Sequence, residues 1–476
     1  MLPGTLDYNS VHHKRPSKNR GTIKYTRKFY EKVAFKGNTL YNRSVRNGNE
    51  IVVARVMPYP LDEHGGVVTN ALGSVEPLRR EEIIVYPSAP RKWWRRGTSP
   101  RTPYFGSSLF KTPRQNTRTD YTVTSSAAAK TFHHRQDWDI IHVDEPTAHL
   151  APPTMFGPLT QLILQAPRRE DGKTRAIFGA TFHSRLDHPS RRNKMERAAM
   201  KLYPLFKTSW GVPYRYRGQL LPTLEETFGS RLLAVSQGTA SFWNEIYPGK
   251  YEVLYNGFDT KKYIPEGEKM DSWRKDGKKI IFMAGRHDPR KRFDLGIEIF
   301  ARLRNYRDDI KLVIAGKGQE TSKLKWLARS LQLPAEDIEF VGFLDERDLP
   351  KAYRTGDIFM APSDGGEGFG RVLAESMACG TPVVTFDIDG YREATNNQPF
   401  TQAVPLYDID AFVLALGEFL DISQETKTTW EHEAWQYIDR NFGWTIIARK
   451  QADIYRRWID EYDRPPVNDK NHKIAA

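Results

Sequence analysis

Short runs of apolar residues recur along the chain, and longer stretches of mixed polar and apolar residues separate them. In the first half these runs occupy residues 51–60, 83–87, 139–143 and 175–182. In the second half they begin near residues 280, 312, 340, 358 and 382. Continuous apolar runs of this length are typical of strands buried on both faces, and the stretches between them are long enough for helices. The pattern predicts an α/β protein with two doubly wound parallel sheets, one in each of two domains.

One turn in the second half of the chain holds the strongest candidate chemistry. A strand at 358–362 runs into this turn, and a helix that begins near residue 371 leaves it. Four glycines surround the turn: Gly365, Gly366, Gly368 and Gly370. Such a turn offers unpaired backbone N–H groups and the positive end of a helix to a phosphate. Glu367 precedes the helix and Glu375 lies on its first turns. We expect Glu375 to reach the ribose of a nucleotide diphosphate, and Glu367 to face the group attached beyond the phosphates.

Residues 359–389 resemble the signature of the retaining glycosyltransferases of family 4. Both have two glutamates separated by seven residues, followed by a segment like the ACGTPVV of this chain. A second resemblance is IIFMAGRHDPRK at 280–291, a strand followed by a loop with Arg286 and Lys291. Further matching segments follow in the family's order at 233–236, 255–259, 312–320, 340–345 and 348–363. The resemblance is dense from 231 to 395 and thinner back to residue 51, and it is to the phosphatidylinositol mannosyltransferase and lipopolysaccharide glucosyltransferase type.

This resemblance implies a GT-B architecture, in which two Rossmann-like domains face each other across a cleft. The N-terminal, acceptor-binding domain is then expected at 49–248 and the donor-binding domain at 249–441. A final helix at 442–462 is expected to pack back on the first domain. Residues 1–48 are polar and basic without an apolar period, and we interpret them as an extension of low order. Residues 463–476 form a polar tail.

The resemblance also implies a site for a nucleotide-diphosphate sugar as co-substrate, with a UDP- or GDP-sugar expected, and no further cofactor. The residues it assigns to the donor are Gly65, Gly66, Arg286, Lys291, Lys317, Phe343, Glu367, Gly368, Phe369, Gly370, Arg371, Val372 and Glu375. The backbone N–H groups of residues 369–372 are expected to hold the diphosphate. Cations at Arg286 and Lys291 would stabilise the negative charge that develops on the departing diphosphate. Arg371 stands where the family has an apolar residue, so its side chain either adds a phosphate contact or points to solvent.

His183 is the best candidate for a catalytic histidine. It follows the strand at 175–182, at the position where doubly wound folds place residues that contact ligands. The resemblance implies that it lies near the donor sugar and orients the acceptor, and its backbone carbonyl is one way to do so. We assign the catalytic roles to His183, Glu367, Arg286 and Lys291. His133, His134, His142, His149 and His188 have no comparable support and are interpreted as structural or surface residues.

The reaction expected from the family is transfer of a sugar to an acceptor hydroxyl with retention of configuration. Retaining glycosidases use two close carboxylates and a covalent intermediate, but here only Glu367 is placed to meet the sugar. A front-face reaction fits better, because the leaving phosphate oxygen itself takes the proton of the acceptor. Asp-x-Asp pairs occur at 137–139, 387–389 and 408–410, and we interpret them as chance rather than as metal ligands. We therefore predict no metal, since cations and a helix terminus supply the charge.

Charge is distributed unevenly along the chain. Residues 1–250 hold 39 Lys and Arg against 20 Asp and Glu, a net of +19, and residues 251–476 hold 33 against 38, a net of −5. This asymmetry predicts an anionic partner for the N-terminal half. Trp93 and Trp94 stand among Arg95, Arg96 and two further basic residues, which suits a membrane interface of anionic lipid. A basic amphipathic helix at 191–206 would serve the same purpose.

These observations favour a lipid or saccharide acceptor at an anionic surface, with protein and small-molecule acceptors as further candidates. The same cations and aromatic rings also suit nucleic acid, so glycosylation of modified DNA is an alternative. A non-catalytic nucleic-acid-binding protein is a third interpretation, disfavoured by the intact set of charged site residues. No run reaches 18 apolar residues, and the N-terminus has no apolar core of a signal peptide. A cytoplasmic protein is therefore expected, with peripheral attachment at the inner membrane face. The single cysteine, Cys379, excludes an internal disulfide framework.

Overall fold

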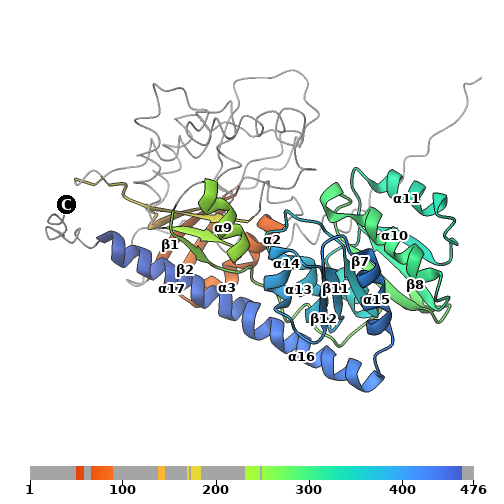
Figure 1. Ribbon diagram of the computed structural model, residues 1–476. Helices are drawn as coiled ribbons and strands as arrows, with labels where there is room; N and C mark the ends of the chain where they lie inside the picture. The colour runs from red at the N-terminus through yellow and green to blue at the C-terminus, as the bar shows by residue number, and fades with distance from the viewer. Residues whose placement is uncertain are drawn as a thin grey trace, which may run out of the picture. The chain divides into compact units, whose positions relative to one another are not determined.

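The computed structural model describes residues 50–57, 66–88, 138–144, 169–170, 173–183, 231–246 and 249–463. Within them, twelve strands form two sheets of six, and every strand pair is parallel. Strands that are parallel to their neighbours must be joined by crossovers, which alternating helices provide. The prediction of an α/β fold with two doubly wound parallel sheets is confirmed (Figure 1).

The first sheet has the strand order β2-β1-β3-β4-β5-β6. Its strands are β1 (Ile51–Val56), β2 (Ile83–Ser88), β3 (Ile140–Asp144), β4 (Ile177–Phe182), β5 (Leu232–Ala234) and β6 (Tyr251–Val253). The described helices near it in sequence are α2 (Gly66–Gly73), α3 (Val75–Arg80) and α9 (Gln237–Ile246). β3 and β4 are buried along their whole length, which is why both read as unbroken apolar runs apart from a few polar residues.

The second sheet has the order β12-β11-β10-β7-β8-β9. Its strands are β7 (Lys279–Ala284), β8 (Ile310–Ala315), β9 (Ile338–Gly342), β10 (Ile358–Ala361), β11 (Val383–Phe386) and β12 (Thr401–Val404). The helices between them are α10 (Phe293–Arg304), α11 (Thr321–Ser330), α12 (Asp348–Thr355), α13 (Arg371–Ala378), α14 (Asp389–Thr395) and α15 (Ile409–Leu420), with short 3-10 turns η4 (Asp271–Arg274) and η5 (Pro289–Lys291). The order reverses between β7 and β10, and loops at the carboxyl ends of strands on either side of such a reversal are where doubly wound sheets bind ligands.

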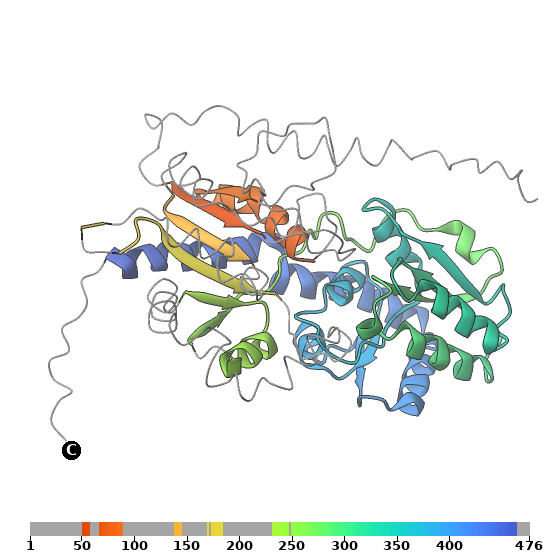
Figure 2. The ribbon, with the colours of Figure 1, turned by 90° about the horizontal axis from the view of Figure 1, so that it is seen from above.

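The chain finishes with two long helices, α16 (Gln424–Phe442) and α17 (Trp444–Asp463). α16 packs against α13, whereas α17 runs along one face of the first sheet (Figures 1 and 2). Ile447, Ala448, Ala452 and Tyr455 of α17 are buried in the same apolar cluster as Val53 and Ile140 of the sheet. Between the two sheets in sequence, Phe258 exchanges backbone hydrogen bonds with the junction of the two helices, donating to Phe442 and accepting from Trp444.

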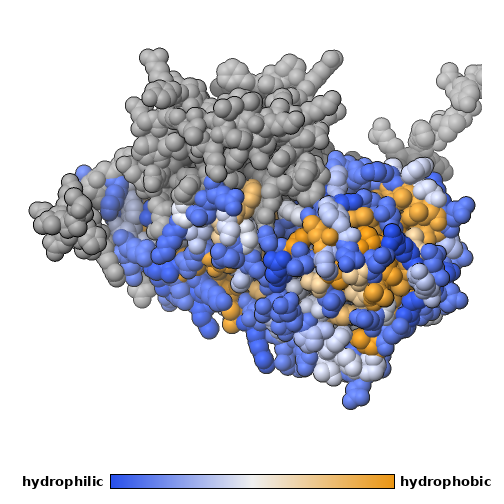
Figure 3. Space-filling view, in the orientation of Figure 1, coloured by the Kyte–Doolittle hydropathy of each residue, from blue (hydrophilic) through white to orange (hydrophobic). Residues whose placement is uncertain are grey.

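The described surface seen in Figure 3 is largely hydrophilic, with groups of hydrophobic residues over the part of the chain that holds the second sheet. Large apolar side chains exposed in this part include Trp326 on α11 and Leu414 on α15, 66% and 67% exposed. In the part of the chain that the structure describes, no helix combines the length and the apolar character needed to cross a membrane. The proposed extension at 1–48 and most of the tail at 463–476 lie outside the described residues, and the domain boundaries stay a prediction.

Candidate active site

The glycine-rich turn joins β10 to α13, as the sequence predicted. Gly370 is the N-cap of α13 and has a φ of 83°, a left-handed conformation that glycine adopts without a Cβ penalty. No side chain caps the helix. The first backbone N–H groups of a helix have no intrahelical partner, and together with the helix dipole they attract an anion. The turn therefore presents an uncapped helix N-terminus, suited to an anion, shortly after Glu367.

The Glu367 carboxylate is buried between two cations. Its Oε1 accepts a hydrogen bond from Arg290 Nη1 at 2.7 Å and lies 2.9 Å from Lys291 Nζ. Burial lowers the pKa of Lys291, and the charge of Glu367 only partly opposes this. For Arg290 burial also lowers the pKa, but the carboxylate of Glu367 more than offsets it, so the pKa lies above its ordinary value. The arrangement concentrates two positive charges beside the helix terminus, in surroundings with little water to screen them.

The two cations predicted from the sequence occupy different environments. Lys291 is paired with Glu367, whereas the Arg286 side chain is exposed and makes no ion pair with any described residue. The cation beside Lys291 is Arg290, which the sequence analysis did not select. Its signal was the run of adjacent basic residues at 290–292, of which only one was assigned a role. Arg286 is thus the cation of this loop that is available to a ligand without first leaving a carboxylate.

Glu375, the second glutamate of the motif, lies on α13 and is 8% exposed. It accepts a hydrogen bond from Tyr353 Oη at 3.1 Å and one from Arg371 Nη2 at 3.3 Å. The Arg371 guanidinium also lies over the ring of Phe258, 4.7 Å from its centroid. Of the two alternatives for Arg371, a side chain pointing to solvent is wrong, because the guanidinium is held over an aromatic ring and against Glu375.

The turn and His183 are brought together by a close backbone approach. A Cβ atom at Gly368 would lie 2.1 Å from the carbonyl oxygen of His183, so only glycine fits there. The carbonyl of Gly368 accepts a hydrogen bond from Thr239 Oγ1 at 3.3 Å. Gly66 belongs to the same surroundings, because a Cβ atom there would lie 3.3 Å from Cδ of Arg371. Residues far apart in the sequence therefore meet at this turn.

Two further residues assigned to the donor, Lys317 and Phe343, lie on the loops after β8 and β9. Lys317 is exposed, and its side chain passes Gly342, where a Cβ atom would lie 3.2 Å from its Cε. Phe343 follows Gly342 and is 52% exposed. Both positions are at the carboxyl-end edge of the second sheet, the edge that also holds the glutamate turn.

Several predicted residues lie outside the described part of the chain. These are Gly65, Trp93, Trp94, Arg95 and Arg96, together with the helix proposed at 191–206 and the histidines His133, His134, His149 and His188. Of the acidic pairs set aside in the sequence, Asp387 and Asp389 both form ion pairs with Arg392. His142, interpreted as structural, is fully buried in β3.

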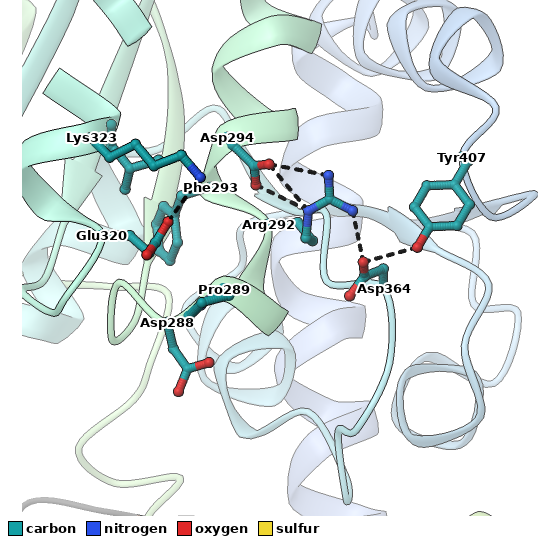
Figure 4. A pocket seen from close by; sticks show the side chains of 10 residues that line it. Asp288, Pro289, Arg292, Phe293, Asp294, Glu320, Lys323, Asp364 and Tyr407 are labelled. Atoms are coloured by element: carbon teal, nitrogen blue, oxygen red, sulfur yellow. Dashed lines mark hydrogen bonds and ion pairs between the residues drawn. The ribbon is translucent and has the colours of Figure 1, made fainter. Parts of the chain in front are cut away.

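A cavity of about 410 Å³ is lined by Asp288, Pro289 and Arg292 of the 288–292 loop and by Asp364, Tyr407 and residues of α10 and α11 (Figure 4). Its polar side chains interact with one another: Arg292 binds Asp294 and Asp364, and Tyr407 donates a hydrogen bond to Asp364 at 3.0 Å. None of its lining residues is among those predicted for the donor. We therefore locate the candidate site at the glutamate turn and not in this cavity.

Residues 266–435 match the family described as glycosyl transferases group 1. This range contains the glutamate turn, its cations and both glutamates. A phosphatidyl-myo-inositol mannosyltransferase from Mycolicibacterium smegmatis is 25% identical over 411 residues, which cover 85% of this chain and 93% of that protein. Residues 266–435 of this chain are those of a group 1 glycosyltransferase. The resemblance drawn from the motifs is confirmed, and the similarity to the phosphatidylinositol mannosyltransferases extends over both sheets.

Solved structures show the same fold as this glycosyltransferase. The sucrose-phosphate synthase of Thermosynechococcus elongatus covers 87% of the chain with a TM-score of 0.63 and 18% identity, and is itself covered in full. HepE of Anabaena in complex with UDP-glucose covers 85% of the chain and 99% of its own length, with a TM-score of 0.59 and 17% identity. Group 1 enzymes are retaining hexosyltransferases, so this glycosyltransferase is an enzyme that uses a nucleotide-sugar donor. A non-catalytic nucleic-acid-binding protein is thereby excluded.

Proposed function

We propose that this glycosyltransferase moves a hexose from a UDP- or GDP-sugar to a hydroxyl of a lipid or saccharide acceptor at an anionic surface. The observation that carries the donor half of the proposal is the buried Glu367 carboxylate between Arg290 and Lys291, next to the uncapped N-terminus of α13. A ligand with a diphosphate and a polyhydroxylated group satisfies both features at once. Phosphate oxygens suit the helix terminus and the cations, and sugar hydroxyls suit the carboxylate.

In this proposal the diphosphate is held by backbone N–H groups of residues 369–372 and by the side chains of Arg286 and Lys291. Glu375 accepts hydrogen bonds from the ribose, and the base lies near Lys317 and Phe343. Glu367 and His183 hydrogen-bond hydroxyls of the transferred sugar. Support comes from the convergence of these residues on one edge of the second sheet and from the contact of Gly368 with the carbonyl of His183.

The proposed reaction occurs on one face of the sugar. The bond between the anomeric carbon and the diphosphate oxygen breaks, and the acceptor oxygen forms its bond to that carbon from the same side. The acceptor proton passes to the departing phosphate oxygen. Preorganised cations favour this step because the negative charge on the diphosphate grows as the bond breaks. Arg286 is the best placed of them, since its side chain is exposed and forms no ion pair with a carboxylate in the described part of the chain.

The acceptor half of the proposal rests on charge and on the relatives. The curated proteins that cover 85% of this chain are phosphatidyl-myo-inositol mannosyltransferases. The net charge of +19 on residues 1–250 favours association with an anionic surface. Trp93 and Trp94 beside Arg95 and Arg96 are the proposed membrane contact, which would make the enzyme a peripheral protein of the cytoplasmic membrane face.

The donor is tested by thermal shift with UDP-glucose, GDP-mannose and ADP-glucose. A ligand that binds only the folded state raises its apparent stability, so we expect one donor to raise Tm and Arg286→Ala to lose that increase. Arg302→Ala is the matched control, because Arg302 of α10 forms an exposed ion pair with Asp410 of α15 and the variant should keep the shift. Absence of any shift in the wild type would contradict the donor site. Equal shifts in wild type and Arg286→Ala would remove Arg286 from it.

The acceptor is tested by sedimentation with vesicles that contain phosphatidylinositol or only neutral lipid. We expect binding to the anionic vesicles, weakened by salt and by Trp93→Ala with Trp94→Ala, and sugar transfer to the anionic lipid fraction. Transfer to duplex DNA with hydroxymethylated bases, with no binding to vesicles, would replace the lipid acceptor by modified DNA.

A further inference from the structure

A second buried charge cluster lies at the carboxyl ends of three neighbouring strands of the first sheet. Arg55 of β1 donates from Nε and Nη2 to the two carboxylate oxygens of Asp144 at the end of β3, at 2.7 and 2.9 Å. Its third nitrogen, Nη1, donates to Ser74 Oγ at 2.6 Å. Arg55 is 2% exposed and Asp144 is fully buried. No part of the reaction described above uses this pair.

The same carboxylate holds His183. Asp144 Oδ1 lies 2.7 Å from Nε2 of the His183 ring, whose side chain is 5% exposed. Side chains alternate along a strand, so Asp144 and His142 share the face that carries Arg55, and His183 shares the face of Thr181. The positions of Arg55 and Asp144 are therefore fixed by the register of parallel strands, and His183 is the first residue after the third strand.

Asp144 is ionised in this setting. Burial by itself raises the pKa of the carboxyl, but the charge and hydrogen bonds of Arg55 more than offset it, so the pKa lies well below its ordinary value. A carboxylate only accepts hydrogen bonds, so Nε2 of His183 carries the proton that is shared with it. In the neutral ring Nδ1 is then the acceptor nitrogen. The Arg55–Asp144 pair is already electrically balanced before the histidine contributes any charge.

The next polar layer is neutral. His142 contacts Thr181 Oγ1 through Nε2 at 2.7 Å and Tyr455 Oη of α17 through Nδ1 at 2.9 Å. Burial lowers the pKa of His142 to about 3, so it adds no charge next to Asp144 at neutral pH. Gln451 donates to Tyr455 Oη at 2.8 Å and completes the chain of hydrogen bonds. The Asp144 carboxylate therefore interacts with Arg55 and His183, and its neighbour His142 stays neutral.

We propose that Asp144, aligned by Arg55, is a positioning residue that fixes the tautomer and ring orientation of His183, so that Nδ1 accepts a hydrogen bond from a hydroxyl of the bound sugar or acceptor. The proposal rests on the assignment of His183 to the donor site made above. Nδ1 of His183 then acts as a hydrogen-bond acceptor for a hydroxyl. Asp144→Asn exchanges the donor and acceptor nitrogens of the ring, because an amide can donate to Nε2 and so favour the tautomer protonated at Nδ1.

The test uses the full chain with ¹⁵N-labelled histidine, with the His183 imidazole signals assigned by their loss in His183→Gln. We expect Nε2 of His183 to be protonated and Nδ1 unprotonated in the wild type at neutral pH, and Asp144→Asn to abolish this pattern. With the donor that the thermal-shift panel identifies, kcat of Asp144→Asn should fall at least about tenfold while the donor KM changes little. Thr181→Val is the matched control, because it removes a buried hydrogen bond to His142 from the same strand ends. It should lower Tm but keep the tautomer and kcat.

A wild-type ring protonated at Nδ1 overturns the proposal whether or not any variant folds. A folded Asp144→Asn that keeps both the tautomer and kcat, and loses only stability, also overturns it and leaves the pair a structural one. If the wild type has the expected tautomer and Asp144→Asn alters it, but neither turns over any nucleotide sugar, the alignment holds and the proposed function fails. The two inferences are therefore tested separately.

Discussion

At the scale of single residues, two buried carboxylates organise the candidate site. Glu367 is held by Arg290 and Lys291, and Asp144 is held by Arg55 and His183. A buried charge is costly unless it is paired and hydrogen-bonded, and removal of one partner leaves the other uncompensated. Under the proposed function, a bound diphosphate would replace Glu367 as the partner of Lys291.

The burial of neutral His142 predicts a dependence of stability on pH. Its pKa of about 3 lies below the value of about 6.5 in an unfolded chain. The unfolded state therefore binds more protons than the folded state as the pH falls below about 6.5. Stability is complete above this value and is lost progressively towards pH 3, at about 1.4 kcal/mol per unit of pKa difference.

Urea unfolding at pH 7, 5.5 and 4.5 checks this against His142→Gln, whose amide is neutral throughout. The difference in unfolding free energy between wild type and variant should shrink as the pH falls. The protonation linkage of Asp144 does not interfere, because Asp144 is present in both proteins and its contribution cancels in the difference. Parallel pH profiles for the two proteins would show that His142 is not buried in the neutral form.

At the scale of elements, the end of β10 and the start of α13 have to meet within a turn that ordinary residues cannot make. Gly370 has a left-handed φ, and a Cβ atom there would lie 2.6 Å from Cδ1 of Tyr391. Tyr391 is fully buried, and its hydroxyl is hydrogen-bonded to Ser363 Oγ at 2.8 Å, so it cannot easily move aside. The direction of the helix terminus thus depends on one glycine.

Gly370→Ala is expected to lower the unfolding free energy by roughly 1–3 kcal/mol and to weaken the thermal shift given by the donor. Gly417→Ala is the control within the second sheet's part of the chain. Gly417 lies in α15 with no atom within 4 Å of an added Cβ, so alanine there should stabilise by about 0.5–1 kcal/mol. Chemical unfolding of both variants gives the comparison. Equal effects would mean that the turn tolerates a side chain.

At the scale of the whole chain, the last helix completes a core that begins almost 400 residues earlier in the sequence. The ring of Trp458 on α17 lies against Gly179 of β4, where an added Cβ atom would be only 2.2 Å away. It also stacks near His142, with ring centroids 6.1 Å apart. The first sheet therefore has one face that is covered by a segment translated only after the second sheet.

Trp458→Ala is expected to cost roughly 3–5 kcal/mol, because it opens a cavity over Gly179 and exposes the face of the sheet that carries His142. Trp326→Ala is the matched control: this tryptophan is 66% exposed on α11, so its loss should change stability by less than about 0.5 kcal/mol. Urea unfolding followed by far-ultraviolet circular dichroism measures both. A Trp458→Ala protein as stable as the control would contradict the role assigned to α17.

The sequence by itself determined the fold class, because strands buried on both faces require unbroken apolar runs and leave that pattern in the chain. It also determined the glutamate turn and its family, since this turn is local: its glycines, its helix terminus and Glu375 all lie within about a dozen residues. These features depend on neighbours along the chain, which a sequence displays directly.

Only the tertiary structure decided which charges meet. Arg290 and Lys291 are adjacent in sequence and Glu367 is more than 70 residues away, so no local pattern favoured Arg290 over Arg286. The sequence analysis selected neither Asp144 nor Arg55, because these residues are 89 positions apart in the chain and their pairing depends on the register of β1 and β3. Alternating polar residues at the ends of those strands were the available signal. Which of these residues form pairs was decided only by the structure, in which the three strand ends lie side by side, because electrostatic partners are set by distance in space.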